Sequence, residues 1–196
     1  MGTSTRAKPT KVAFLVSAEG IEQAELTAPW QAVIEAGCRP VLVSQETGDV
    51  QAYRHLDKAD RFAVDMRTAD AGAEDFAALV LPGGVANGDA LRTQDDAVRF
   101  VRAFDGIGKP IAVICHGGWV LIDAGVVRGR RVTSWPSLQT DYRNAGAIWV
   151  DEEVVVDAGI PTLISSRKPD DLPAFCRELV HAIAAGATTA HASVTG

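Results

Sequence analysis

The chain has 196 residues, of which 47% are hydrophobic, and this is enough apolar material for one substantial core. Its formal net charge of −6 disfavours nucleic acid and anionic membranes as partners. The first residues lack the apolar core of a signal peptide and no run reaches membrane-spanning length, so we expect a cytoplasmic protein with no membrane attachment. Three cysteines without regular spacing suit reduced thiols better than a disulfide framework.

Apolar runs and helical periodicities alternate along the chain. We expect strands at residues 11–16, 40–44, 77–81, 109–114, 132–134, 148–156 and 162–165. We expect helices at residues 25–36, 95–104, 138–145 and from 172 onward, with another directly after residue 118. Residues 45–75 are polar and turn-rich, which predicts an irregular or hairpin excursion.

One domain accounts for nearly the whole chain. We place it at residues 11–185, with flexible tails at residues 1–10 and 186–196, because both ends are small and polar. Pro29 falls inside the first expected helix, where it should bend the helix or mark a late start.

A cysteine, a histidine and two glycines end the apolar run that starts at Lys109. The run predicts a central strand, and Gly117 and Gly118 allow a sharp reversal into a helix. Cys115 would then stand at a helix N-terminus, where free N–H groups and the helix dipole stabilise a thiolate at neutral pH. Taken alone, a cysteine after a valine and an isoleucine is more often a core residue. The turn and a second site upstream favour a nucleophile.

That second site is the Pro82-Gly83-Gly84 turn, which closes another apolar run. Such loops gather at the carboxyl edge of a parallel sheet, where ligands bind. A glycine there brings a backbone N–H close to a substrate oxygen. We therefore expect Gly84 and the N–H of His116 to form an oxyanion hole, with Gly117 also among the substrate-binding residues. Read as structure alone, this tripeptide is an ordinary turn.

Further motifs accompany these two in a specific order. They are Lys11-Val12-Ala13-Phe14-Leu15, Gly20-Ile21-Glu22-Gln23-Ala24-Glu25-Leu26, Leu81-Pro82-Gly83-Gly84, Ile114-Cys115-His116-Gly117, Ala124-Gly125-Val126-Val127-Arg128-Gly129-Arg130, Thr133-Ser134-Trp135 and Ser166-Arg167-Lys168-Pro169-Asp170-Asp171-Leu172-Pro173-Ala174-Phe175. Together they resemble the PfpI branch of the ThiJ/PfpI superfamily over about residues 11–183. The resemblance implies an α/β, flavodoxin-like three-layer sandwich with a mostly parallel sheet and a cysteine nucleophile elbow, self-associated as a dimer or hexamer. Members of this family have been called intracellular proteases, stress proteins, glyoxalases and deglycases.

The resemblance also assigns two acids to the site. Glu22 occupies the motif position whose carboxyl hydrogen-bonds the nucleophilic sulfur, and a carboxyl beside a thiolate should be protonated. Asp89 occupies the position of an acid that, in PfpI-like oligomers, reaches the histidine of a neighbouring subunit, here His116. Without the resemblance, Glu19, Glu22 and Glu25 are indistinguishable, and Asp89 is nearly as well explained as a turn or helix-start acid.

Some features depart from the patterns of related proteins. Gly88 and Gly118 stand where relatives often carry proline, which should loosen both loops. Class I glutamine amidotransferases carry a His-x-Glu pair near the C-terminus, whereas His181 and His191 lack the glutamate, so a glutaminase is disfavoured. No residues have metal-ligand spacing and no phosphate-binding loop is present, so we expect neither a metal nor a cofactor.

These residues favour an enzyme. Cys115 would attack a small carbonyl carbon, His116 would move protons, and Glu22 would position the thiol. Glyoxalase- or deglycase-like chemistry through a hemithioacetal is the leading interpretation. A PfpI-type cysteine peptidase or hydrolase acting on peptides is the second. A redox-sensing or chaperone-like stress protein is the third, because an accessible, activated thiol is readily oxidised.

Overall fold

The computed structural model describes residues 9–192 and confirms the α/β fold with a mostly parallel central sheet. The strand order is β11-β12-β8-β7-β1-β3-β6, and neighbouring strands are parallel except for β11 and β12. The strands of this sheet are β1 (Lys11–Leu15), β3 (Arg39–Ser44), β6 (Met66–Arg67), β7 (Ala78–Leu81), β8 (Ile111–Ile114), β11 (Val154–Asp157) and β12 (Leu163–Ser166). The helices are α1 (Gln23–Glu35), α2 (Val85–Arg92), α3 (Asp95–Gly106), α4 (Trp119–Ala124), α5 (Gln139–Asn144) and α6 (Leu172–Ala192).

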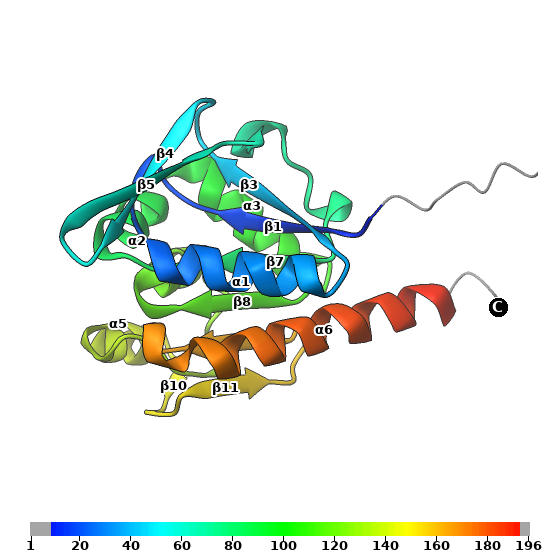
Figure 1. Ribbon diagram of the computed structural model, residues 1–196. Helices are drawn as coiled ribbons and strands as arrows, with labels where there is room; N and C mark the ends of the chain where they lie inside the picture. The colour runs from blue at the N-terminus through cyan, green and yellow to red at the C-terminus, as the bar shows by residue number, and fades with distance from the viewer. Residues whose placement is uncertain (1–8, 193–196) are drawn as a thin grey trace, which may run out of the picture.

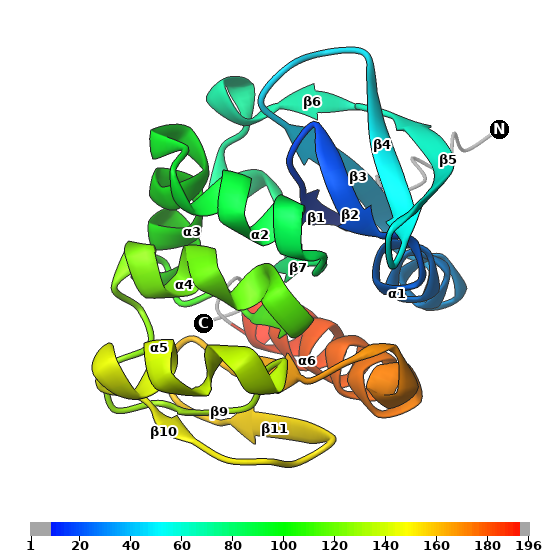
Figure 2. The ribbon, with the colours of Figure 1, turned by 90° about the vertical axis from the view of Figure 1, so that its left-hand side faces the viewer.

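Helices cover both faces of the sheet. Helices α1 and α6 pack side by side on one face, and α2, α3 and α4 lie on the other (Figures 1 and 2). Strand β1 shows how the sequence supplies two cores: Val12 and Phe14 join the core under α1 and α6, while Ala13 and Leu15 join the opposite one. Because both faces of these strands are buried, the strands are apolar throughout, which is the pattern that predicted them.

A second sheet stands apart from the first. It contains β2 (Glu19–Glu22), β4 (Asp49–Arg54) and β5 (Asp57–Ala63), and β4 and β5 form the hairpin expected within residues 45–75. Gln23 fixes this hairpin to the start of α1, because its amide donates to Asp60 Oδ2 at 2.6 Å and accepts from the Asp60 N–H at 2.8 Å. The remaining elements are β9 (Arg131–Val132), β10 (Ile148–Trp149) and the 3-10 turns η1 (Thr68–Asp70), η2 (Ala73–Asp75), η3 (Cys115–Gly118), η4 (Pro136–Leu138) and η5 (Pro169–Asp171).

Two boundaries differ from the expectation. Helix α1 begins two residues early and runs through Pro29, so the proline does not mark its start. Helix α6 continues to Ala192, so residues 186–192, which were expected to belong to the C-terminal tail, are helical. The predicted tail segments 1–8 and 193–196 lie outside the described residues. Within residues 9–192, none of the helices combines the length and apolarity needed to span a bilayer.

The expected looseness at Gly88 and Gly118 is also wrong. Gly88 lies inside α2, where a Cβ would stand 2.2 Å from the backbone oxygen of His116. At Gly118 a Cβ would stand 1.9 Å from the hydroxyl of Tyr142. Both glycines therefore allow a close approach that a side chain would block.

This packing yields a test of the α4–α5 contact. Gly118→Ala should lower the free energy of unfolding by about 1–3 kcal/mol, because the new methyl overlaps the Tyr142 hydroxyl. That hydroxyl is buried and has no hydrogen-bond partner among the described residues, so Tyr142→Phe should be close to neutral. The double variant should recover part of the loss, because the oxygen is gone but the ring remains. Urea denaturation measures the free energy of unfolding of the two single variants and the double variant. If the effects of the two single substitutions simply add in the double variant, Gly118 and Tyr142 are not in contact.

Candidate active site

The candidate site lies where the direction of the sheet order reverses. Strand β3 lies on one side of β1, whereas the later strands β7 and β8 lie on its other side, so the strand order reverses at β1. Ligands bind at such switch points in open α/β sheets. Loops after β1, β7 and β8 enclose a cavity of about 580 Å³ there. The cavity is lined by Glu19, Gly20, Glu22, Glu25, Tyr53, His55, Leu56, Gly84, Val85, Ala86, Asp89, Cys115, His116, Trp119, Trp135 and Pro169.

Cys115 begins the turn between β8 and α4, as predicted. Its φ of 60° is unusual for a residue with a side chain, and only 6% of the residue is exposed. Gly117 allows the turn to lie against the end of β7, since a Cβ there would be 2.6 Å from the Leu81 oxygen. Cys115 therefore lines the cavity while it also packs against the buried core under α1 and α6.

Backbone donors surround the sulfur. The N–H groups of Gly84 and His116 both hydrogen-bond Cys115 and lower the pKa of its thiol. Gly84 has a φ of 98°, and a Cβ on it would stand 2.0 Å from the Gly20 oxygen. The structure thus brings together the two N–H groups expected to form an oxyanion hole.

The carboxyl beside the sulfur is that of Glu25, so the prediction of Glu22 is wrong. Glu25 is fully buried in the first turn of α1, where its side chain hydrogen-bonds Cys115 and its Oε2 accepts the Gly83 N–H at 3.0 Å. Glu22 is the last residue of β2, and its carboxylate instead accepts the backbone N–H of His55 at 3.0 Å. The physical reason is that α1 starts at Gln23, which turns Glu25 inward.

Burial controls the protonation of this pair. Burial raises the pKa of Glu25 to about 8, so its carboxyl is neutral at pH 7. Burial and the nearby Glu25 carboxyl also raise the pKa of Cys115, which outweighs the two N–H donors. A protonated acid beside the sulfur was expected, but at Glu22 instead of Glu25. The expected thiolate of Cys115 at neutral pH is not found, because the raised pKa keeps the thiol protonated until a base removes the proton.

His116 is the base within reach. Its Nδ1 lies 3.2 Å from Cys115 Sγ, and burial lowers the pKa of the imidazole, which leaves it neutral and able to accept a proton. The imidazole packs near two indoles, and its ring centroid lies 5.3 Å from that of Trp119 and 5.6 Å from that of Trp135. Ser137 Oγ lies 3.4 Å from Nε2. These contacts fix the ring against the sulfur.

Asp89 lines the same cavity but does not contact His116 within one chain. Its side chain is exposed on α2, and within the described residues it forms no hydrogen bond or ion pair with the imidazole. The side of the ring away from the sulfur is occupied by Ser137 instead. A role for Asp89 at the histidine of another subunit stays a prediction.

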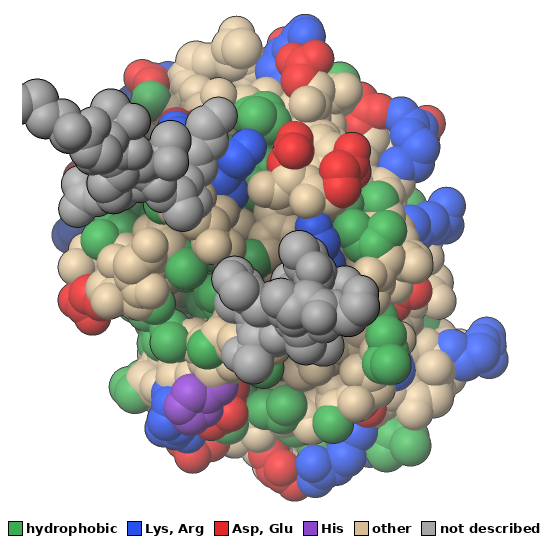
Figure 3. Space-filling view, turned by 90° about the vertical axis from the view of Figure 1, so that its right-hand side faces the viewer, with side chains coloured by type: hydrophobic (Ala, Val, Ile, Leu, Met, Phe, Trp, Pro, Cys, Tyr) green, Lys and Arg blue, Asp and Glu red, His purple; other side chains and the backbone are tan. Residues whose placement is uncertain are grey.

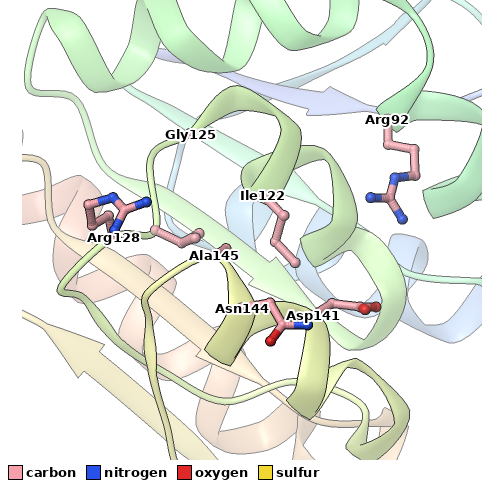
Figure 4. Close-up of a pocket in the computed structure, with 8 residues that line it drawn as sticks. Arg92, Ile122, Gly125, Arg128, Asp141, Asn144 and Ala145 are labelled. Atoms are coloured by element: carbon pink, nitrogen blue, oxygen red, sulfur yellow. The ribbon is translucent and has the colours of Figure 1, made fainter.

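A separate hollow of about 420 Å³ lies between α4 and α5 (Figure 4). Arg92 and Asp141, two of the residues around it, both engage Trp119: the Arg92 guanidinium lies 5.5 Å from the ring centroid, and Asp141 accepts the indole N–H at 2.8 Å. This hollow contains no cysteine or histidine, and its residues support Trp119, which packs on His116.

Sequence reasoning missed the two tryptophans beside His116 and the contribution of the β4–β5 hairpin to the cavity. Trp119 follows Cys115 by one helical turn, a spacing that places it beside the elbow, so a signal was present. Trp135 entered only as part of a family motif. The β4–β5 hairpin brings Tyr53, His55 and Leu56 to the cavity, and the local sequence gives no signal for this placement, which depends on the pairing of β4 with β2.

Comparisons with known proteins agree with this architecture. The model of the DJ-1/PfpI family matches residues 10–182, and the chain belongs to this family. Deglycase PH1704 of Pyrococcus horikoshii is 42% identical over 170 residues, which cover 87% of this chain and 97% of that protein. General stress protein 18 of Bacillus subtilis is 40% identical over 157 residues, which cover 80% of this chain and 88% of that protein. The crystal structure of a ThiJ/PfpI domain protein from Brachyspira murdochii superposes with a TM-score of 0.83 at 18% sequence identity. The match covers 91% of this chain and 99% of that one.

The Glu25–Cys115 pair predicts a distinctive pH profile for alkylation. Below pH 8, labelling of Cys115 by iodoacetamide should rise about tenfold per pH unit, as for any thiol below its pKa. Above the Glu25 pKa of about 8 it should level off, because ionised Glu25 opposes formation of the thiolate. Glu25→Gln cannot ionise, so its labelling should keep rising. Mass spectrometry of the Cys115 peptide measures the rates.

Glu22→Gln is the matched control, because it makes the same chemical change three residues away. It should keep the plateau. A plateau lost in Glu22→Gln and kept in Glu25→Gln would return the role to Glu22.

Proposed function

We propose that this protein is a cysteine-dependent enzyme that acts on small reactive carbonyl compounds, with glyoxalase- or deglycase-like chemistry through a hemithioacetal on Cys115. The observation that carries the proposal is the sulfur's surroundings: an imidazole nitrogen at 3.2 Å, a buried neutral acid and two backbone N–H groups. The name of the Pyrococcus horikoshii relative, Deglycase PH1704, supports a protective activity of this type.

The first step is addition of the thiol to an aldehyde carbon. The sulfur–carbon bond forms as His116 Nδ1 takes the thiol proton, and the carbonyl electron pair moves onto oxygen. The N–H groups of Gly84 and His116, which already point at the sulfur, stabilise that oxygen until it is protonated. Glu25 hydrogen-bonds the sulfur without adding a negative charge to it. The product is a hemithioacetal.

An α-oxoaldehyde then needs an internal redox step. A proton leaves the former aldehyde carbon and another is added to the neighbouring ketone carbon, so the first carbon is oxidised to a thioester and the second is reduced to an alcohol. Water releases a 2-hydroxy acid and regenerates the thiol. His116, whose Nδ1 lies 3.2 Å from Cys115 Sγ and whose ring contacts Trp119 and Trp135, would carry these protons. No outside oxidant or reductant is needed.

Turnover of methylglyoxal separates this proposal from its alternatives. The wild-type protein should convert it to lactate, and Cys115→Ser should lose at least about a hundredfold of the rate, because an alcohol is a far weaker nucleophile at neutral pH. Cys38→Ser is the control, since Cys38 does not line the cavity. Proton NMR follows both compounds. Full activity in Cys115→Ser, or cleavage of a fluorogenic peptide without methylglyoxal consumption, would contradict the proposal.

We also propose that self-association completes the site, with Asp89 of one subunit orienting His116 of another. This extends the family resemblance, and the exposure of Asp89 at the cavity leaves it available to a second copy. A carboxylate there would stabilise the imidazolium that forms when His116 accepts the thiol proton.

Subunit mixing tests this arrangement. Cys115→Ala and Asp89→Ala should each be nearly inactive alone, and mixed oligomers should recover part of the activity, because some interfaces pair an intact cysteine with an intact aspartate. Native mass spectrometry verifies the mixing. No recovery in verified mixed oligomers, or full activity in a demonstrated monomer, would show that Asp89 does not act across subunits.

A further inference from the structure

We propose that the mouth of the Cys115 cavity is a charge filter, which favours cationic and neutral carbonyl compounds over anionic ones, and that Glu19 and Glu22 set this preference. The identity of the natural substrates rests on the proposed function. The selectivity itself concerns access to the sulfur and is testable without turnover.

The charges that line the cavity are of one sign. Glu19, Glu22 and Asp89 are solvent-reachable carboxylates, which are negative at neutral pH, and the described lining contains no lysine or arginine. Glu25 is neutral there because of its burial, and so is His116. Any charged molecule that enters therefore meets a negative rim.

This negative charge is not cancelled by ion pairs. Glu19 accepts the Tyr53 hydroxyl at 3.5 Å and Glu22 accepts a backbone N–H, so both partners are neutral donors. Within the described part of the chain, neither carboxylate nor that of Asp89 lies within 4.0 Å of a basic group. Elsewhere many acids are paired with arginines, for example Asp157 with Arg130 at 2.7 Å.

The carboxyl inside the cavity adds no charge to this rim. Glu25 is fully buried and lines the cavity, its Oε2 accepts the Gly83 N–H at 3.0 Å, and its side chain hydrogen-bonds Cys115. The carboxylates at the rim therefore supply the negative charge that an entering molecule meets before it reaches the sulfur.

Basic residues near the cavity do not line it: Arg54 and Lys58 belong to the hairpin that carries Tyr53, and Arg92 lines the separate hollow. Arg92 lies over Trp119, pairs with Asp123 at 2.8 Å and lines the separate hollow (Figure 4). At the far end of the molecule, Figure 3 shows acidic and basic side chains interspersed over the visible surface. The single-sign rim is thus a local feature of the cavity.

The walls of the cavity strengthen the filter. Leu56, Val85 and Trp135 line it with exposed apolar side chains, and Leu56 at the hairpin tip is 94% exposed. These apolar side chains carry no counter-charge, so they leave the field of the carboxylates at the mouth uncompensated. The favoured substrates are carbonyl groups attached to protonated amines or guanidinium groups, and the disfavoured ones are α-oxo acids.

Charged thiol reagents measure the filter directly. Two methanethiosulfonates of similar size, one with a trimethylammonium-ethyl group and one with a sulfonato-ethyl group, each form a disulfide with Cys115 and release methanesulfinate. We expect the cation-to-anion rate ratio at Cys115 to exceed that of free 2-mercaptoethanol by at least about tenfold at low salt. In 0.5 M sodium chloride, the rate ratio at Cys115 should fall towards that of the free thiol, because salt screens the carboxylates.

Variants that each remove one carboxylate charge show which residues produce the charge preference at Cys115. Glu19→Gln and Glu22→Gln should each lower the ratio by about three- to tenfold, the effect of one unit charge at close range. Both amides keep an oxygen that can accept the existing hydrogen bond. Glu153→Gln makes the same change at an exposed residue outside the cavity and should leave the ratio unaltered. Rates with uncharged methyl methanethiosulfonate normalise each variant for changes in access.

The outcomes are distinct from those that test the enzyme. A wild-type ratio equal to that of free thiol, or one that Glu153→Gln lowers as much as Glu22→Gln, would overturn the filter. Loss of methylglyoxal turnover with the ratio intact would instead contradict the proposed function alone.

Discussion

The close approach of three backbone and side-chain groups at Gly83 is the constraint on which the site depends. A Cβ at this residue would stand 2.2 Å from Glu25 Oε2 and 2.6 Å from Cys115 Cβ. Only glycine leaves room for the acid and the cysteine to meet, while its N–H holds the acid at 3.0 Å. The meeting point is buried, so the two acidic groups retain their protons and share one apolar environment.

The surrounding loops hold this arrangement in place. Asn87, fully buried in α2, accepts the Ser17 N–H at 2.8 Å and donates to the carbonyl oxygens of Pro82 and Gly83 at 2.9 and 3.2 Å. It thereby fastens the end of β1 to the end of β7 on either side of the switch point. Inside the cavity, Glu25 and His116 are buried and neutral, whereas the carboxylates of Glu19 and Asp89 at its mouth are exposed. Under the proposed function, this separation would let one cavity combine a buried nucleophile with selection of substrates at the entrance.

Local sequence patterns account for most of the fold and half of the site. Apolar runs closed by glycines located β7, β8 and the turn at Cys115, because a buried strand followed by a tight reversal has a strong local signature. The choice between Glu22 and Glu25 depended on where α1 begins, and that boundary is set by a contact between Gln23 and the distant hairpin. The protonation state of the thiol depends on burial, which is a property of the assembled structure. The helical end of α6 was missed because small residues were interpreted as a tail.

Every property of this site depends on Glu25 being a protonated acid beside Cys115 in the resting protein. Infrared difference spectroscopy of wild type against Glu25→Gln at pH 7 measures this protonation, because a protonated carboxyl has a carbonyl-stretch band that a carboxylate lacks. We expect this band in the wild type, its absence in Glu25→Gln, and its loss as the pH rises through about 8. A spectrum at pH 7 in which Glu25 contributes only carboxylate bands would contradict it.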